Sequence, residues 1–238
     1  MSNSPETRNL RQYLEALTSS GLSPLDFLPE GSTEEKIIGL ALNGSPPGVS
    51  STLAGLFHGT LERLSSVNTD GLRVVTLGGG TGLSNIVGGD SRRTDWQDNP
   101  FTGLKEIFSG ITSIVCVTDD GGSTGELLKY LPLVGLGDLR HVLVSSVRRE
   151  NLRNLYRLDD RGAGRLAATL HRIFNYRFNA PGISPEELLS GADMANGLPG
   201  ELRDYFRRLV DRLFADNRLK RTLAQPQCLG NLLLASAM

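Results

Sequence analysis

The sequence has little that would suit an oxidising, membrane or nucleic-acid environment. Only two of its 238 residues are cysteines, Cys116 and Cys228, and their distance along the chain favours reduced thiols in a reducing compartment. No apolar run approaches the roughly 20 residues of a bilayer-spanning helix, and residues 1–12 are polar where a signal peptide has its apolar core. The 25 basic and 26 acidic residues nearly cancel, which indicates no nucleic-acid or membrane partner. We therefore expect a cytoplasmic protein.

Several common catalytic patterns are missing too. The histidines His58, His141 and His171 have no metal-ligand spacing, so we interpret all three as structural. The sequence holds no G-x-S-x-G elbow, zinc pattern or Cys-His pairing. The glycine-rich segments remain as the features that carry a chemical signal.

The most informative segment is RVVTLGGGTG, residues 73–82. Residues 73–77 are apolar and β-branched, which predicts a buried strand, and apolar residues at helical spacing follow from Leu83. A strand, a glycine-rich turn and a helix start together aim backbone N–H groups at an anion. Glycine allows a phosphate to approach closely, and some of these residues are expected at positive φ. The spacing fits neither a Walker A loop nor G-x-G-x-x-G, and a purely structural turn is the alternative.

A second glycine-rich segment follows the run ITSIVCVT, residues 111–118. This run predicts a strand that is parallel to the first and buried on both faces. Residues 119–125, DDGGSTG, then lie at its carboxyl end, where open α/β sheets bind their ligands. We expect one carboxylate, Asp119 or Asp120, to face a metal or a hydroxyl while the other caps the loop. The alternative is an ordinary Asx turn. We refer below to the glycine loop (78–82) and the double-aspartate loop (119–125).

The third candidate segment is GDLR, residues 137–140. Asp138 stands where a helix N-cap is expected. Arg140 would lie in the first helical turn, where a cation opposes the helix dipole unless an anion pairs with it. A row of arginines recurs every fourth residue after this helix, and we interpret it mainly as a solvated face that Gly162 and Gly164 interrupt. The row consists of Arg149, Arg153, Arg157, Arg161 and Arg165.

The N-terminal part, residues 1–70, differs in character from the rest and is predicted to be helical. Apolar residues at helical spacing run from Leu10 to Leu17. Ser32 is a plausible N-cap of a second helix, and Ser50 or Ser51 can cap a third helix that continues through Leu64. We expect a helical extension that packs on a main domain formed by residues 71–238; a partner-docking module is the alternative. Further helices are expected at 165–176, 184–189 and 201–214.

Four motifs occur in order: GGGTGLS at 78–84, DDGGSTG at 119–125, GDLR at 137–140 and LGNLLLA at 229–235. Together they resemble the CofD-like and YvcK-like family, which holds 2-phospho-L-lactate transferases and bacterial gluconeogenesis factors. The resemblance covers roughly residues 72 to 238. The DDGGSTG form is more similar to the gluconeogenesis-factor branch, whose members bind a nucleotide sugar.

The resemblance implies a nucleotide-binding protein with a regulatory role. Its ligand would be a nucleotide diphosphate or nucleotide sugar, with Mg²⁺ held by Asp119 and Asp120, which are also the candidate catalytic residues. The alternative is an enzyme that moves a phospholactyl-type group from a guanosine-diphosphate-linked donor to a hydroxyl acceptor. A dinucleotide-dependent oxidoreductase is a weaker third reading, because the glycine spacing is wrong. The implied ligand-binding residues are Gly78, Gly79, Gly80, Thr81, Gly82, Ser84, Gly121, Gly122, Ser123, Thr124, Asp138, Arg140, Gly230 and Asn231.

The chain departs from the family at three places. Residues 88–100 form a polar connection instead of a regular helix, and the segment before Gly137 lacks the usual prolines. Gln227-Cys228 stands where the family commonly has His-Ser, which removes a titratable group from the implied site. We also find only two convincing strands, whereas such sheets usually have about five or six. The expected fold is therefore an α/β, Rossmann-like parallel sheet with helices, truncated, and completed by further chain or by a second copy in a homo-oligomer.

Overall fold

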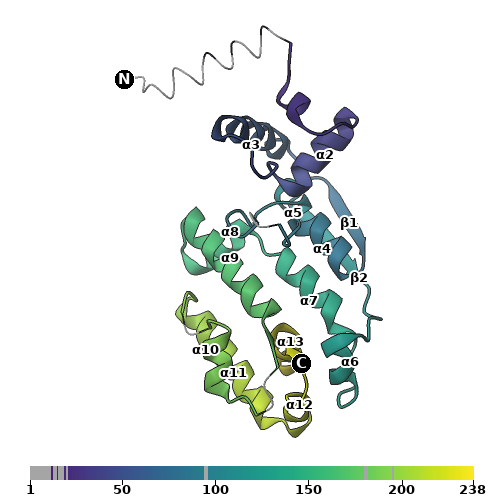
Figure 1. Ribbon diagram of the computed structural model, residues 1–238, viewed down its shortest axis with the longest axis vertical. Helices are drawn as coiled ribbons and strands as arrows, with labels where there is room; N and C mark the ends of the chain where they lie inside the picture. The colour runs from purple at the N-terminus through teal and green to yellow at the C-terminus, as the bar shows by residue number, and fades with distance from the viewer. Residues whose placement is uncertain are drawn as a thin grey trace.

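The computed structural model describes residues 12, 15, 19, 21–93, 96–179, 182–194 and 196–238. It shows an α/β chain in which a small parallel sheet lies at one side of a helical body (Figure 1). The helical stripe expected from Leu10 to Leu17 lies outside the described residues. None of the helices that the structure describes is long and apolar enough to cross a bilayer.

Within the described residues, the predicted helices and the two predicted strands are present with some differences in their bounds. The N-terminal part and the sheet region consist of η1 (Pro24–Phe27), α2 (Thr33–Asn43), α3 (Ser51–Ser65), β1 (Arg73–Gly78), α4 (Gly80–Gly88), α5 (Leu104–Ile107), β2 (Gly110–Val115), α6 (Gly122–Leu128) and α7 (Leu136–Ser145). The remainder consists of α8 (Arg149–Tyr156), α9 (Asp160–Asn175), β3 (Arg177–Phe178), α10 (Pro185–Gly191), α11 (Gly200–Ala215), α12 (Asn217–Thr222), β4 (Gln227–Cys228) and α13 (Leu229–Ala237). Of these, η1, α6, α12, β3 and β4 are additional to the predicted elements.

The parallel pairing of the two main strands is confirmed, but the expected burial, on both faces for the second strand, is wrong. β1 and β2 pair in register from Arg73 with Gly110 to Gly78 with Val115. One face of this sheet contacts a small core that α4 and α7 form. The other face leaves Val75 and Ile114 54% exposed and Leu77 70% exposed. Apolar side chains occur on both faces of these strands, but the described elements cover only one face.

The larger core is helical. It is formed by buried side chains of α6 to α13, and α13 contributes Leu229, Leu232 and Leu233, each at most 2% exposed. A short antiparallel pair, β3 with β4, which the sequence patterns did not predict, leads into α13. The backbone N–H of Leu229 donates to the carbonyl of Tyr176 at 2.9 Å, so this pair fixes the start of α13 against the end of α9.

The N-terminal helices begin where their caps predict. Ser32 forms a capping box with Glu35, and the Ser50 hydroxyl accepts a hydrogen bond from the N–H of Leu53. α2 contacts α4 and α5, and α3 contacts α5. The guanidinium of Arg93 donates to the carbonyls of Asn43 and Ser45, at 2.7 and 2.8 Å. The N-terminal segment therefore packs directly on the sheet region.

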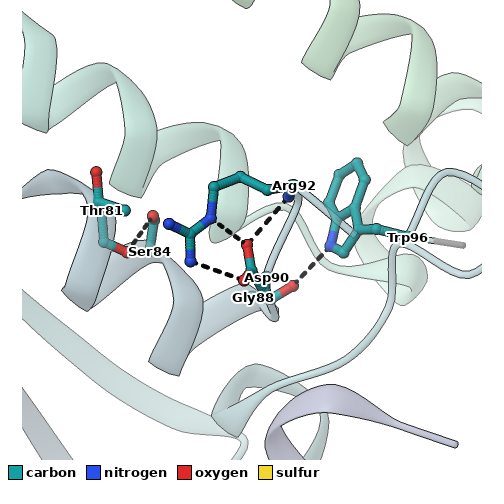
Figure 2. A network of polar contacts seen from close by, with 6 residues as sticks. All are labelled: Thr81, Ser84, Gly88, Asp90, Arg92 and Trp96. Atoms are coloured by element: carbon teal, nitrogen blue, oxygen red, sulfur yellow. Dashed lines mark hydrogen bonds and ion pairs between the residues drawn. The ribbon is translucent and has the colours of Figure 1, made fainter. Parts of the chain in front are cut away.

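The polar connection after α4 is anchored by its tryptophan. Trp96 is 5% exposed, and its Nε1–H donates to the carbonyl of Gly88 at 3.1 Å (Figure 2). The Arg92 guanidinium donates twice to Asp90, at 2.8 Å each, and these hydrogen bonds lower the pKa of that carboxyl. The connection therefore caps the end of α4, and its described residues form no helix.

The arginine row spans two helices rather than one broken at glycines. α8 ends at Arg157, whose φ of 52° is left-handed, and α9 starts after Asp159, whose carboxylate accepts from the N–H of Gly162 at 2.7 Å. Gly162 and Gly164 lie inside α9, so the expected break at these glycines is wrong. Four members of the row are exposed, as expected of a solvated face, and Arg149 is half-buried.

Candidate functional site

The glycine loop joins β1 to α4 as the sequence predicts. β1 ends at Gly78, and α4 starts at Gly80 after Gly79, which serves as an extended N-cap with φ −89° and ψ −178°. None of these loop glycines has a positive φ, so that expectation is wrong. Ser84 is buried, and its hydroxyl donates to the carbonyl of Thr81 at 2.9 Å inside the helix (Figure 2). The exposed groups at this helix N-terminus are therefore the backbone, Thr81 and Gly82.

Two of the loop glycines pack closely against Asp138. A Cβ on Gly79 would lie 2.9 Å from Asp138 Oδ2, and one on Gly80 would lie 2.8 Å from Asp138 Cα. A Cβ on Gly82 would meet nothing within 4 Å. Gly80 is thus required by the contact between α4 and α7, because it approaches the Asp138 backbone, whereas Gly79 approaches only the end of the Asp138 side chain and Gly82 is left for approach from solvent.

Asp138 is not the N-cap of α7. Gly135 has that place, and Asp138 lies in the first turn. Its carboxylate approaches the N-terminus of α4, where a negative charge is favourable. The helix begins earlier than expected because Leu136, 1% exposed, already belongs to the core.

The double-aspartate loop gives its two carboxylates different roles. Asp119 Oδ1 accepts a hydrogen bond from the N–H of Gly121 at 3.0 Å, which is the Asx turn considered above. The Asp120 carboxylate accepts no hydrogen bond from the part of the chain that the structure describes. Both aspartates are exposed. Gly122, with φ 54°, supplies the left-handed turn that starts α6.

The LGN motif closes on the double-aspartate loop. Asn231 Nδ2 donates to Ser123 Oγ at 2.9 Å and to Thr124 Oγ1 at 3.3 Å. All three side chains are at most 7% exposed, and Asn231 Oδ1 is buried without a hydrogen-bond donor. The structure therefore brings residues 123–124 and 231 together, although more than 100 positions separate them.

Arg140 is used inside the protein. It is 3% exposed; its Nη1 donates to the carbonyl of Phe174 at 2.9 Å and contacts Cys228 Sγ. Its Nη2 lies 2.7 Å from His141 Nε2. A Cβ on Gly230 would lie 2.6 Å from Arg140 Cδ, so this glycine makes room for the arginine. Burial lowers the pKa of Arg140, and the guanidinium ties α7 to the junction of α9 and α13.

Two glycines of this region were missed by sequence reasoning. A Cβ on Gly135 would lie 2.6 Å from the carbonyl oxygen of Asp119, and one on Gly137 would lie 3.3 Å from Thr124 Oγ1. The signal was available, because Gly-Leu-Gly forms the start of α7, with Gly135 as its N-cap. These contacts join GDLR to the double-aspartate loop, as Gly79 and Gly80 join it to the glycine loop.

The donor set at this edge suits magnesium. No group of three or more His, Cys, Asp or Glu side chains able to hold a metal occurs among the described residues. Mg²⁺ needs no such group, because it commonly binds one or two carboxylates and completes its shell with water and phosphate oxygens. Asp120 and the Oδ2 atom of Asp119 make no hydrogen bond with the described residues, so these carboxylate oxygens are of the right kind.

Comparisons with known proteins agree with the motifs. The model of the family described as 2-phospho-L-lactate transferase CofD matches residues 74–238, more than half of the chain. A putative gluconeogenesis factor of Deinococcus radiodurans is 49% identical over 69 residues, 29% of this chain and 12% of that protein. The gluconeogenesis factor of Halalkalibacterium halodurans is 36% identical over 139 residues, 58% of this chain and 33% of that protein. The chain thus spans a third or less of these relatives. No solved structure matches at a significant level.

Proposed function

The chain belongs to the CofD family, and from this premise we propose that its glycine loop and double-aspartate loop bind the diphosphate of a nucleotide or nucleotide sugar. The observation that carries the proposal is the contact of four sequence motifs at one edge of the sheet. Asp138 lies against the glycine loop, Gly137 against Thr124, and Asn231 against Ser123. Helix N-termini at the carboxyl end of parallel strands favour a phosphate.

Each exposed group has a role in this proposal. The backbone N–H groups from Gly80 to Gly82 would contact phosphate oxygens, because these groups have no partner within the first turn of a helix. Asp120 and Asp119 would hold Mg²⁺, which supplies positive charge beside the diphosphate. Ser123, Thr124 and Asn231 support the loop from beneath, since they are buried and bonded to one another.

A binding role is favoured over catalysis by residues 227–228. Gln227 and Cys228 are 1% and 0% exposed, and Cys228 contacts Arg140. Neither side chain offers an exposed acid or base next to a bound substrate. A regulatory protein that senses a nucleotide sugar, in line with the relatives named gluconeogenesis factor, is therefore the preferred function.

The alternative is a transferase, which the printed name of the matching family favours. Such an enzyme would move a phosphorus-containing group from a nucleotide-linked donor to a hydroxyl. Asp120 would then orient the acceptor, since its carboxylate is exposed and accepts no hydrogen bond from the described residues. Release of a nucleotide only when an acceptor is added would favour this reading.

Calorimetry with the whole chain tests the proposal. We expect UDP, GDP or a UDP-sugar to bind in the presence of MgCl₂, and EDTA to weaken that binding. The control variant Arg161→Gln should bind the nucleotide as the wild-type chain does, because this arginine is exposed on α9 and belongs to none of the motifs. If none of these nucleotides binds at millimolar concentration, and none copurifies with the chain, the proposed function is wrong.

A further inference from the structure

A large cavity lies at the opposite edge of the sheet from the candidate nucleotide site. Its volume is about 1150 Å³, and its walls come from α3, α5 and α8 and from the segments that lead into β1 and β2. These three helices lie near one another in the upper half of Figure 1. Both strands start here, and they lead to the glycine loop (β1) and the double-aspartate loop (β2), so roughly 17–20 Å of strand separates the two places.

The wall formed by α5 and the start of α8 carries three cations. Lys105 is 5% exposed, and its Nζ donates to the carbonyls of Pro100 and Ser145, at 3.1 and 2.8 Å, rather than to a carboxylate. Arg148 donates to the carbonyl of Phe108 at 2.7 Å. Arg149 lies over the ring of Phe101, with 4.9 Å from Cζ to the ring centroid.

The carboxylate of Glu106 acts on this cluster. Glu106 is half-buried beside the three cations and makes no hydrogen bond with the described residues. Burial raises its pKa, and burial lowers the pKa of Lys105 to about 8, with Arg148 and Arg149 acting in the same direction. Three cations against two carboxylates, Glu106 and the exposed Glu150, leave an excess of positive charge at a partly desolvated wall, which is costly without an anion.

Further carboxylates line other parts of the cavity, so the excess of positive charge is confined to the wall that carries Lys105, Arg148 and Arg149. Asp160 pairs with Arg153 at 3.3 Å, and Glu62 pairs with His58 at 3.2 Å. The remaining acid of the cavity, Asp70, is exposed. In addition, the Nε atom of Arg149 is buried and has no hydrogen-bond partner. A buried donor without a partner carries a free-energy cost, so the protein around Arg149 does not satisfy this side chain fully.

We propose that this cavity is an effector site for a small phosphorylated metabolite, whose phosphate binds Arg148, Arg149 and Lys105. Arginine forks match the geometry of phosphate oxygens, and Lys105 adds a point charge. The cavity is large enough for a sugar phosphate, since ligand pockets commonly measure about 300–1,000 Å³. His58, Glu62 and Ser66 from α3 and its end form the facing wall. A ligand therefore bridges the N-terminal helices and the sheet region, and its binding holds them together.

The test is calorimetry of the whole chain at pH 7 with inorganic phosphate, glucose 6-phosphate and citrate as separate probes. EDTA is present, so that the Mg²⁺-dependent nucleotide site does not contribute. We expect glucose 6-phosphate to bind, inorganic phosphate to compete, and Arg149→Gln and Arg148→Gln each to weaken binding at least tenfold. Arg161→Gln, an exposed arginine outside the cavity, and Asp120→Asn should leave it unchanged. Circular dichroism establishes that each variant is folded.

Three results would overturn the proposal. The first is no binding of either phosphate compound at millimolar concentration. The second is an equal loss in Arg161→Gln, which would indicate diffuse surface charge. The third is tighter binding of citrate than of both phosphate compounds. Raising the pH from 7 to 9 should also weaken glucose 6-phosphate binding, because Lys105 loses its charge around pH 8. These outcomes are independent of the nucleotide site, which is tested with Mg²⁺ and nucleotides.

Discussion

Gly80→Ala and Gly82→Ala, two residues apart in the first turn of α4, should change stability in opposite directions. A Cβ at Gly80 would lie 2.8 Å from the backbone Cα of Asp138, so α7 must shift to admit it. Overpacking of this kind costs about 1–3 kcal/mol. A Cβ at Gly82 meets nothing within 4 Å, and replacing an exposed helical glycine by alanine gains up to roughly 1 kcal/mol.

Urea unfolding followed by circular dichroism measures both effects in one experiment. The midpoint should fall for Gly80→Ala and rise slightly for Gly82→Ala, with unchanged slopes. The same two variants distinguish an effect on stability from an effect on nucleotide affinity. Gly82→Ala should weaken nucleotide binding even though it stabilises the fold. A Gly80→Ala variant as stable as Gly82→Ala would refute the tight contact between α4 and α7 on which the site depends.

Four further expectations follow from single features. Arg140→Ala should destabilise the chain by about 1.5–3 kcal/mol in urea unfolding, because the buried guanidinium donates to the carbonyl of Phe174. Arg157→Gly should instead stabilise it by up to about 1 kcal/mol in the same assay, since φ at this position is 52°. Burial lowers the pKa of His171 to about 4, so the unfolded chain protonates first and stability should fall as the pH drops from about 6.5 to 4; NMR titration of the ring checks the value. Finally, the exposed sheet face around Leu77 should bind a hydrophobic dye or mediate oligomers, and Leu77→Thr should reduce the signal; a dye-silent monomer would contradict this.

Local patterns predicted the elements well because their causes are local. Ser32 and Ser50 cap α2 and α3 as expected, and the glycine pair after Val87 ends α4. The two β-branched runs form the parallel strands. In each case the deciding interaction lies within four residues or in an uninterrupted apolar run.

The errors concern features that depend on distant packing. The strands read as buried, the second on both faces, yet Leu77 and Ile114 are exposed because the described helices cover one face only. Some residues of the glycine loop were expected at positive φ, but Gly80 is required because Asp138, 58 positions further along the chain, packs against it. Lys105 carried no signal at all, because a lysine in a short helix is usually solvated and only the fold buries it.

The candidate site was predicted in its composition but not in its contacts. The motifs identified Thr124, Asn231 and Arg140. No pattern indicated that Asn231 bonds to Thr124, or that Arg140 would be used by Phe174 and Cys228 instead of remaining open to a phosphate. Those contacts join segments 34 to 108 residues apart, and such pairings follow from the fold rather than from spacing.

The most direct test of the account compares Mg²⁺-dependent nucleotide binding in the wild-type chain with that in Asp120→Asn. The Asp120 carboxylate is exposed and accepts no hydrogen bond from the described residues, so the substitution should leave the unfolding midpoint unchanged. Calorimetry with the tightest-binding of UDP, GDP and a UDP-sugar should then show at least tenfold weaker binding, about 1.4 kcal/mol, in MgCl₂. Binding of equal strength in the two chains would contradict the central claim that this edge of the sheet holds a metal-bound diphosphate.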